Sequence, residues 1–271
     1  MAAWWGDPGL VARIEAIEQE TGGTICLTAR ELGAGHAVRY RGDRRCKTAS
    51  VIKTPLLVHI AMAVGEGALS WSDELTLTDE EKVAGSGVLT QLGAGLKLTL
   101  RDVCVLMTIV SDNTATNMLI EQFGVAQVNE RMRSLGLPLT TLYRKSYTPD
   151  TEVSREYGLG MTTPDEMADL MQMLAEGRVG GPAVSAEILA ILAGQCLRDS
   201  IPRALPPDWK YAGKTGGIDG VRNDAALVTA PDGSQFVLAL FCQDLHDMQW
   251  TPDNAGLVAL GRITRALLAT R

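Results

Sequence analysis

A serine and a lysine stand three positions apart where an apolar segment begins, and this spacing could join a nucleophile to its base. Ser50 and Lys53 precede the run Leu56–Met62, which predicts a helix. Residues three apart share a helix face, so the two side chains can touch. A serine hydroxyl needs a base to take its proton, and lysine can be that base only if burial or a neighbouring cation keeps it neutral. The pair therefore predicts acyl transfer on Ser50, activated by Lys53.

The same pair also fits a structural role, in which Ser50 caps a helix N-terminus and Lys53 is solvated. Pro55 follows closely and lacks the N–H that would bond back to Val51. Early helix N–H groups have no intrahelical partner in any case, so the proline does not exclude a helix here. The S-x-x-K pattern alone leaves both interpretations open.

Two further motifs favour the catalytic interpretation. Ser111-Asp112-Asn113 follows the apolar segment Val103–Val110, and Lys214-Thr215-Gly216 ends the strand-like run Trp209–Gly213. Each pattern occurs once, and the order S-x-x-K, S-D-N, K-T-G is the signature set of class A β-lactamases and penicillin-binding proteins. The chain thus resembles a class A β-lactamase-type serine hydrolase from about Thr24 to its C-terminus.

The resemblance implies a catalytic role for each of these residues. Ser50 attacks the acyl carbon and Lys53 takes its proton, directly or through water, while Ser111 with Lys214 passes a proton to the leaving nitrogen. The backbone N–H groups of Ser50 and Gly217 would stabilise the oxyanion. Lys214 close to Lys53 would also lower the pKa of both amines.

Other positions match the substrate-binding residues of the family. Asn113, Thr215 and Arg222 would hold the substrate amide and carboxylate, since arginine offers a bidentate fork; an exposed strand charge is the alternative for Arg222. Gly216, followed by a second glycine, would let the substrate approach a strand edge closely. Ser86, between two glycines, falls at the mouth of the family's cleft, or else is a simple turn serine.

One family feature is missing. Class A β-lactamases release the acyl group with water activated by a loop glutamate in an E-x-x-L-N pattern. Counting the family spacing back from Thr163-Pro164 reaches Tyr147, and the run from 145 to 151 contains neither the glutamate nor Leu-Asn. A rearranged loop could supply one of the nearby acids, Asp150, Glu152 or Glu156. Otherwise acylation should survive and deacylation should be slow.

The hydrophobic periods predict an α+β, β-lactamase-like fold. Strand patterns occur near both ends of the chain, and helical patterns fill the middle. We expect one antiparallel sheet formed by both termini with flanking helices, plus an all-helical insert and the active site in the seam. The expected domains are 1–49 with 205–271, and 50–204. Expected strands are 24–29, 36–40, 210–213, 225–229 and 236–241; expected terminal helices are 8–21, with Asp7 as its N-cap, and 254–268; 143–161 is expected to be a functional loop.

Composition excludes several classes of function. The net charge of −7 over 271 residues argues against a nucleic-acid partner, and we interpret the basic cluster from Arg39 to Lys47 as a solvated loop. No apolar run is long enough to span a membrane. The five cysteines imply no disulfide framework, and three scattered histidines imply no metal; we expect no cofactor. Met1–Pro8 lacks the pattern of a secretory leader, so we expect a cytoplasmic protein, or a periplasmic or secreted one if a leader was trimmed.

The sequence therefore predicts a β-lactamase-like serine hydrolase that acts on a small β-lactam, peptide or ester, with slow deacylation. The alternatives are a D,D-peptidase, penicillin-binding or esterase activity, and a non-catalytic binding protein on the same fold. The oligomeric state is not indicated by any pattern.

Overall fold

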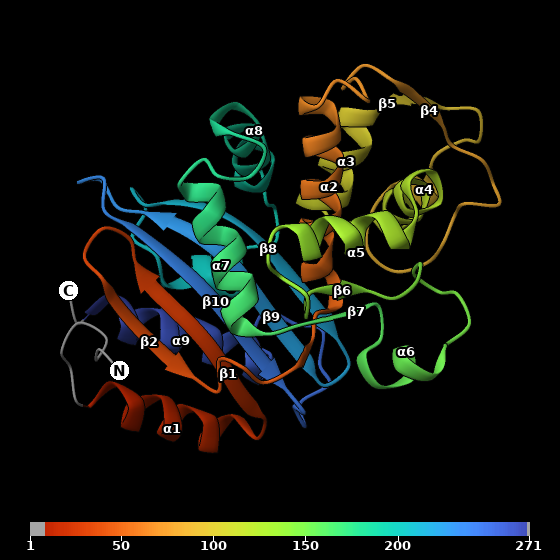
Figure 1. Cartoon of the computed structure of the whole chain (residues 1–271). Coiled ribbons are helices and arrows are strands. Elements are labelled where there is room, and N and C mark those ends of the chain that lie inside the picture. Colours follow the sequence, from red (N-terminus) through yellow and green to blue (C-terminus); the bar gives the residue numbers. More distant parts are fainter. Residues whose placement is uncertain (1–8, 270–271) are drawn as a thin grey trace.

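A five-stranded antiparallel sheet forms one half of the molecule, and both ends of the chain contribute to it (Figure 1). The computed structural model describes residues 9–269. The strand order is β2-β1-β10-β9-β8, so β8 lies at an edge. The bounds are β1 Thr24–Glu31, β2 His36–Tyr40, β8 Lys210–Ile218, β9 Val221–Thr229 and β10 Gln235–Gln243. The predicted fold class is confirmed.

Strand β10 shows why the sheet is covered on both faces. Its residues Phe236, Leu238 and Leu240 pack in one core, and the alternate residues Val237 and Ala239 pack in the other. Successive side chains of a strand point to opposite faces, so a fully apolar strand must be buried on both. The terminal helices α1, Leu10–Thr21, and α9, Ala255–Ala269, cover one face, and α7, Pro164–Ala175, crosses the other.

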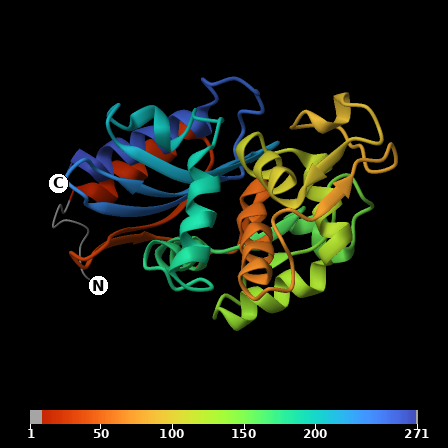
Figure 2. The same cartoon turned by 90° about the horizontal axis from the view of Figure 1, so that it is seen from above.

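The other half of the molecule is mainly helical and lies beside the sheet (Figure 2). Its remaining helices are α2 Lys53–Gly65, α3 Leu100–Ile109, α4 Asn113–Phe123, α5 Val125–Ser134, α6 Glu152–Tyr157 and α8 Pro182–Ala193, with 3-10 helices at Ala49–Ile52 and Leu89–Gln91. A third 3-10 helix, Ile201–Ala204, packs against α9 on the sheet side. The helical half also contains or borders short strands: β3 Cys46–Lys47, β4 Glu74–Thr76, β5 Lys97–Thr99, β6 Thr141–Leu142 and β7 Gly160–Thr162. The predicted all-helical insert thus holds strands too short to show a period.

Helix α2 runs through the centre of the helical half and fixes the start of the S-x-x-K motif. Nine of its thirteen residues are buried, including Lys53 and Pro55. A helix that is apolar on all sides is one that other elements surround. Pro55 is accommodated in the first turn, where its missing N–H has no intrahelical acceptor to lose. Ser50 lies on the preceding 3-10 helix rather than on the α-helix that the spacing predicted.

The predicted loop 143–161 contains the short helix α6. Thr151 caps it by accepting a hydrogen bond from the Ser154 N–H, and the Ser154 hydroxyl accepts one from the Thr151 N–H. Six residues make less than two helical turns, so no hydrophobic period could reveal this helix.

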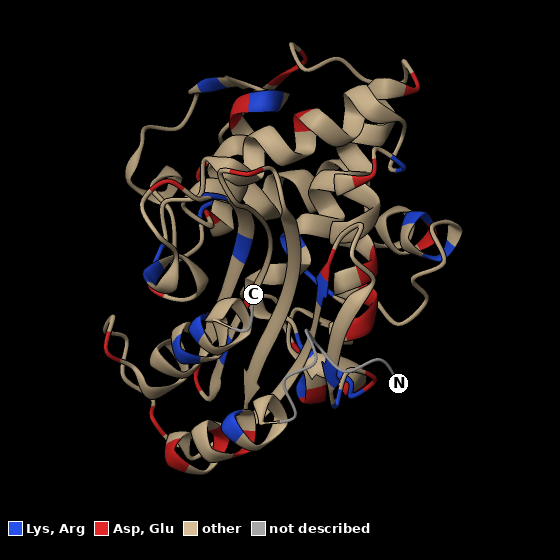
Figure 3. Cartoon of the chain, turned by 90° about the vertical axis from the view of Figure 1, so that its left-hand side faces the viewer, with Lys and Arg blue, Asp and Glu red and all other residues tan. Residues whose placement is uncertain are grey.

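Charged residues of both signs are interspersed over the helices and loops, and the sheet strands carry few (Figure 3). In the basic cluster that begins at Arg39, three arginines are paired with acids: Arg39 with Asp165, Arg41 with Glu18 and Arg44 with Asp244. The cluster is a loop only in part, because Arg39 lies on β2 and Lys47 lies on a short strand, Cys46–Lys47.

Within residues 9–269, no helix is long and apolar enough to cross a membrane. No cluster of His, Cys, Asp and Glu in this range is arranged to hold a metal ion. The five cysteines are all free thiols, and Cys196 alone among them is exposed. Asp7, expected to cap α1, and the rest of the segment 1–8 lie outside the described residues.

Candidate active site

Three elements bring the predicted catalytic side chains together. Ser50 lies on the 3-10 helix before α2, Ser111 precedes α4, and Lys214 lies on the edge strand β8. The residue before the nucleophile, Ala49, has φ +45°, and Ser111 has φ +56°. Such left-handed conformations are uncommon for residues other than glycine and often mark functional sites.

The backbone before the nucleophile is held by an amide side chain from the middle of the sheet. Asn223 on β9 is fully buried, and its Nδ2 donates to the carbonyls of Lys47 at 2.8 Å and Thr48 at 3.1 Å. Gln243 on β10 donates to Asn223 Oδ1 at 2.8 Å and accepts from the Lys47 N–H at 3.0 Å. This network, which the sequence analysis missed, ties the Ser50 turn to the sheet.

Lys53 is buried beside the S-D-N motif. Its Nζ donates to the Ser111 carbonyl at 2.7 Å and to Asn113 Oδ1 at 2.9 Å, and it lies 3.2 Å from Ser111 Oγ. Burial, and then the cation of Lys214, lower its pKa well below the usual lysine value. The hydrogen bonds of Lys53 Nζ do not include Ser50, and Ser50 Oγ has no hydrogen-bond partner among the described residues. Proton transfer from Ser50 to Lys53 would therefore need a small movement or a bridging water.

Lys214 approaches the same serine hydroxyl from the sheet. Its Nζ lies 3.1 Å from Ser111 Oγ and donates to the Thr215 carbonyl at 2.9 Å. Lys214 is fully buried, and desolvation lowers its pKa to about 7. The hydroxyl between the two amines can accept a proton from one and donate its own to the other. This arrangement can relay a proton to a group bound in front of Ser111.

The loop that carries Ser86 is fixed by the middle residue of the S-D-N motif. Asp112 Oδ2 accepts from the N–H groups of Val88 at 2.6 Å and Leu89 at 2.9 Å. Gly87, with φ +112°, lies so close that a Cβ there would be 2.2 Å from Asp112 Cγ. Only glycine fits this approach, and it brings Ser86 into the pocket.

The edge strand packs directly against the Ser50 turn. A Cβ at Gly216 would lie 2.6 Å from the Thr48 carbonyl oxygen and 3.1 Å from the Ser50 nitrogen. Glycine is therefore required for this contact. Because β8 is an edge strand, its outward backbone groups around Gly217 have no neighbouring strand and can face a substrate.

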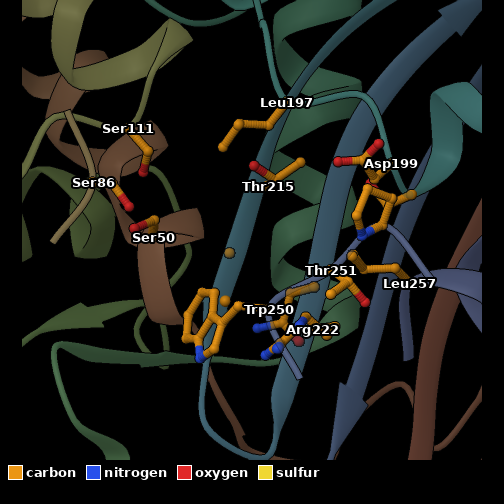
Figure 4. Close-up of a pocket in the computed structure, with 15 residues that line it drawn as sticks. Ser50, Ser86, Ser111, Leu197, Asp199, Thr215, Arg222, Trp250, Thr251 and Leu257 are labelled. Carbon is orange, nitrogen blue, oxygen red and sulfur yellow. The ribbon is translucent and has the colours of Figure 1, made fainter. Parts of the chain in front are cut away.

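A pocket of about 240 Å³ opens in front of Ser50 (Figure 4). Of the predicted residues, Ser50, Ser86, Ser111, Thr215, Gly216, Gly217 and Arg222 line it, while Lys53, Lys214 and Asn113 lie outside its lining. The sequence analysis missed the remaining lining residues, Leu197, Asp199, Ser200, Asn223, Trp250, Thr251, Pro252 and Leu257. Most of these belong to connecting segments in which no motif marks them.

Arg222 is buried, and part of its guanidinium group is already bonded to backbone carbonyls. Its side chain is 3% exposed, and Nη1 donates to the carbonyls of Ile218 at 2.7 Å and Val221 at 2.8 Å. Nη2 donates to the Gln249 carbonyl at 2.7 Å, and the guanidinium lies 4.5 Å from the centre of the Trp250 ring. Burial lowers its pKa below the usual arginine value. The alternative of an exposed strand charge is therefore wrong, and substrate-carboxylate binding by Arg222 stays a prediction.

The loop after β6 is attached to α4 by a side-chain amide. Asn117 Oδ1 accepts from the Ser146 N–H at 2.8 Å, and its Nδ2 donates to the Ser146 carbonyl at 2.9 Å. Tyr147 has φ +59° and is 64% exposed. A Cβ at Gly85 would lie 2.5 Å from its hydroxyl and 2.6 Å from Asn113 Nδ2, which places Tyr147 at the rim of the site.

The three candidate loop acids lie away from the pocket lining. Asp150 is paired with Arg144 at 2.9 Å. Glu152 is exposed in the first turn of α6, and Glu156 contacts Tyr157. No acid of this loop therefore faces the Ser50 pocket in the described structure.

Comparisons with known proteins show the family and the fold of the chain. Residues 9–270 match the model of the β-lactamase enzyme family. A β-lactamase of Streptomyces lavendulae is 28% identical to this chain, over 99% of this chain and 88% of the length of that β-lactamase. The crystal structure of a β-lactamase from Sphaerobacter thermophilus is 38% identical, with a TM-score of 0.87 over 97% of both chains. The structure of PBP-A is 27% identical, with a TM-score of 0.86 over 97% of this chain and 95% of that chain.

The fold and the site thus define a serine hydrolase of the class A β-lactamase type. The chain belongs to the β-lactamase enzyme family, whose model covers nearly all of it.

Proposed function

We propose that the protein opens a β-lactam, or a related amide or ester, through an acyl-enzyme on Ser50. Neutral Lys53 accepts the Ser50 proton, directly or through water, as the serine oxygen bonds to the carbonyl carbon. The N–H groups of Ser50 and Gly217 stabilise the oxyanion. When the bond to the leaving atom breaks, Ser111 gives that atom its proton and regains one from Lys214. The substrate is a small molecule, as the family implies.

The observation that carries this proposal is the Ser111 hydroxyl between two buried amines. Lys53 Nζ and Lys214 Nζ lie 3.2 Å and 3.1 Å from Ser111 Oγ. A structural lysine is normally solvated or paired with a carboxylate, yet neither amine forms a salt bridge within residues 9–269. Ser50 and Ser111 come from the segment 50–204, and Lys214 comes from the sheet segments 1–49 and 205–271. This supports a site in the seam between the two proposed domains.

We also infer that the acyl-enzyme is hydrolysed slowly. Asn117 holds the loop at Ser146, and no acid of the loop lines the pocket. A water molecule near the ester would therefore lack a loop carboxylate as base. A variant of PBP-A, a protein 26% identical to this chain with a TM-score of 0.85, has been solved as an acyl-enzyme complex with penicillin G.

Slow hydrolysis of the acyl-enzyme is also compatible with a second activity, namely D,D-peptidase-like acyl transfer or esterase action. A long-lived acyl-enzyme can pass its acyl group to an amine instead of to water. If this is the native reaction, adding a D-amino acid should shorten the lifetime of the adduct. A non-catalytic binding role is the third possibility, and it would leave the native function intact in Ser50→Ala.

Intact-protein mass spectrometry tests the proposal directly. The wild-type chain is incubated with a penicillin, a cephalosporin and an activated ester, and Ser50→Ala serves as the control. We expect an adduct with the mass of the acyl group on the wild type alone, and a slow return to the free mass. If the wild type forms no adduct and turns over none of the three compounds, the proposal is wrong.

A further inference from the structure

Trp250 is the most exposed large hydrophobic residue among residues 9–269, yet its orientation is fixed. The side chain is 67% exposed at the mouth of the pocket. Its indole N–H donates to Asp219 at 3.1 Å, and its ring stacks 4.5 Å from the guanidinium carbon of Arg222. A Cβ at Gly217 would lie 3.5 Å from the ring, so the indole stands beside the proposed oxyanion residue. An ordered, solvent-exposed aromatic ring next to a reacting centre is typical of a binding surface.

The segment that carries Trp250 is held by several hydrogen bonds. The Gln249 carbonyl accepts from Arg222 Nη2 at 2.7 Å and from Asn254 Nδ2 at 3.0 Å. Arg203 donates to the Pro252 carbonyl at 2.7 Å. Arg222 thus donates three hydrogen bonds to backbone carbonyls, and one face of its guanidinium group stacks on the indole. These contacts make Arg222 a support for Trp250, and they leave its other two N–H groups for a ligand in the pocket that it lines.

The pocket runs along β8 from Ser50 and Ser111 to this ring (Figure 4). Leu197, Pro252 and Leu257 are the other apolar side chains of the pocket lining, so we call Trp250 and these three residues the apolar bay. The leaving atom must lie by Ser111, which gives it a proton in the proposed reaction. A group attached to that atom can then run past Thr215 into the bay.

We propose that the bay formed by Leu197, Trp250, Pro252 and Leu257 binds an aromatic group on the leaving side of the substrate, stacked on Trp250. The inference rests on the proposed acyl transfer at Ser50 and specifies its substrate class. Stacking of two aromatic rings, together with the burial of apolar surface, should favour an aryl over an alkyl leaving group by about tenfold.

Two acetate esters with leaving groups of similar acidity test the inference, phenyl acetate and hexafluoroisopropyl acetate. The second-order rate of Ser50 acetylation is measured for each ester, and the ratio of the two rates is compared between variants. We expect Trp250→Ala to lower the phenyl preference about tenfold, mainly through KM, and Trp250→Phe to retain most of it. Met248→Ala is the matched control, because Met248 is 52% exposed nearby but does not line the pocket.

A second comparison separates the two roles of Arg222. With phenyl acetate and its para-carboxy derivative, Arg222→Gln should lower both rates together, because the variant loosens Trp250. A selective loss with the carboxylated ester would overturn the supporting role of Arg222. An unchanged phenyl preference in Trp250→Ala would overturn the aromatic bay while leaving acyl transfer at Ser50 intact. If the wild type is acetylated by neither ester, the inference fails, and the penicillin adduct measured by mass spectrometry decides separately whether the proposed acyl transfer at Ser50 also fails.

Discussion

Lys53 and Lys214 approach one hydroxyl from opposite halves of the molecule, at 3.2 Å and 3.1 Å from Ser111 Oγ. Each amine is buried, and burial disfavours its charged form. Two nearby ammonium groups would also repel each other, so at most one of the two amines carries its proton easily. Near pH 7, where ordinary lysines are fully charged, the site can therefore hold one neutral amine beside one ammonium group.

The first prediction concerns the pH dependence of acylation. The pKa of Lys53 lies well below the usual lysine value, so its base form becomes available as the pH rises through that lowered pKa. Acylation by a reactive ester should therefore reach its plateau well below pH 10, and Lys53→Ala should lower the plateau by about 10²-fold or more. Stopped-flow rates against pH for both proteins provide the measurement. Equal rates and equal profiles would remove Lys53 from the mechanism.

The second prediction concerns the cost of burying Lys214. Its folded pKa of about 7 lies below its ordinary value of 10.5, so the unfolded chain binds more protons between these pH values. The penalty on folding is thus full below pH 7 and disappears as the pH rises past the ordinary value. We expect Lys214→Met to raise the free energy of unfolding by roughly 1–3 kcal/mol at pH 6, and by less at pH 10.

Urea unfolding of wild type and Lys214→Met at the two pH values checks this expectation, with acylation measured in parallel. Acylation should fall even though the fold is more stable, because Lys214→Met removes the amine that returns a proton to Ser111 in the proposed reaction. A residue kept for catalysis can reduce stability. A variant less stable than the wild type at pH 6 would show that the hydrogen bonds of Lys214 outweigh its desolvation.

The third prediction concerns deacylation and compares two neighbouring positions. Asn117 lies on α4, one helical turn after Asn113, which contacts Lys53. Its side chain fixes the backbone of Ser146. Ser146 is 9% exposed, whereas Tyr147 is 64% exposed at the rim. A glutamate at 146 is therefore the better placed of the two to activate water. We expect Ser146→Glu to speed loss of the penicilloyl group at least tenfold, and Tyr147→Glu to change it little.

The lifetime of the adduct, followed by mass spectrometry, decides between the two variants. Circular dichroism should first establish that both variants fold as the wild type does. Faster deacylation in Tyr147→Glu alone would mean that the spacing count, and not the Asn117 contact, locates the functional loop position.

The candidate catalytic side chains could be selected from the sequence because each lies in a short motif of unusual composition, and the structure brings Lys53, Ser111 and Lys214 together. Their meeting point required only that the two halves of the chain pack together, which the strand and helix periods predicted. The strand β9 illustrates what could not be identified. It was expected to begin at Ala225, and it begins at Val221. Its first half was not predicted because residues 222–224 are all polar, and a run of polar side chains lacks the hydrophobic pattern of a buried strand.

The partners of these three residues explain the failure. Arg222 donates to backbone carbonyls, Asn223 holds the turn before Ser50, and Asp224 accepts hydrogen bonds from Tyr211 and Ser200. All three are buried and satisfied by groups distant in the sequence. A local pattern carries no information about such long-range partners. The same holds for Trp250, whose role depends on where the segment before α9 crosses the pocket mouth.

The last prediction concerns Asn223 as the support of the nucleophile. Its amide donates to two carbonyls of the chain just before Ala49, whose φ of +45° is unfavourable without such restraint. Asn223→Ala leaves both carbonyls and the Gln243 amide without this partner, so the free energy of unfolding should fall by about 1–3 kcal/mol. The Ser50 turn should also relax, and acylation should slow by at least tenfold at a temperature where the variant is still folded. Asn129→Ala is the matched control, because Asn129 also bonds the backbone, at Leu142, but far from the pocket lining. A similar loss of stability with unchanged acylation in Asn223→Ala would show that the network stabilises the sheet without positioning Ser50.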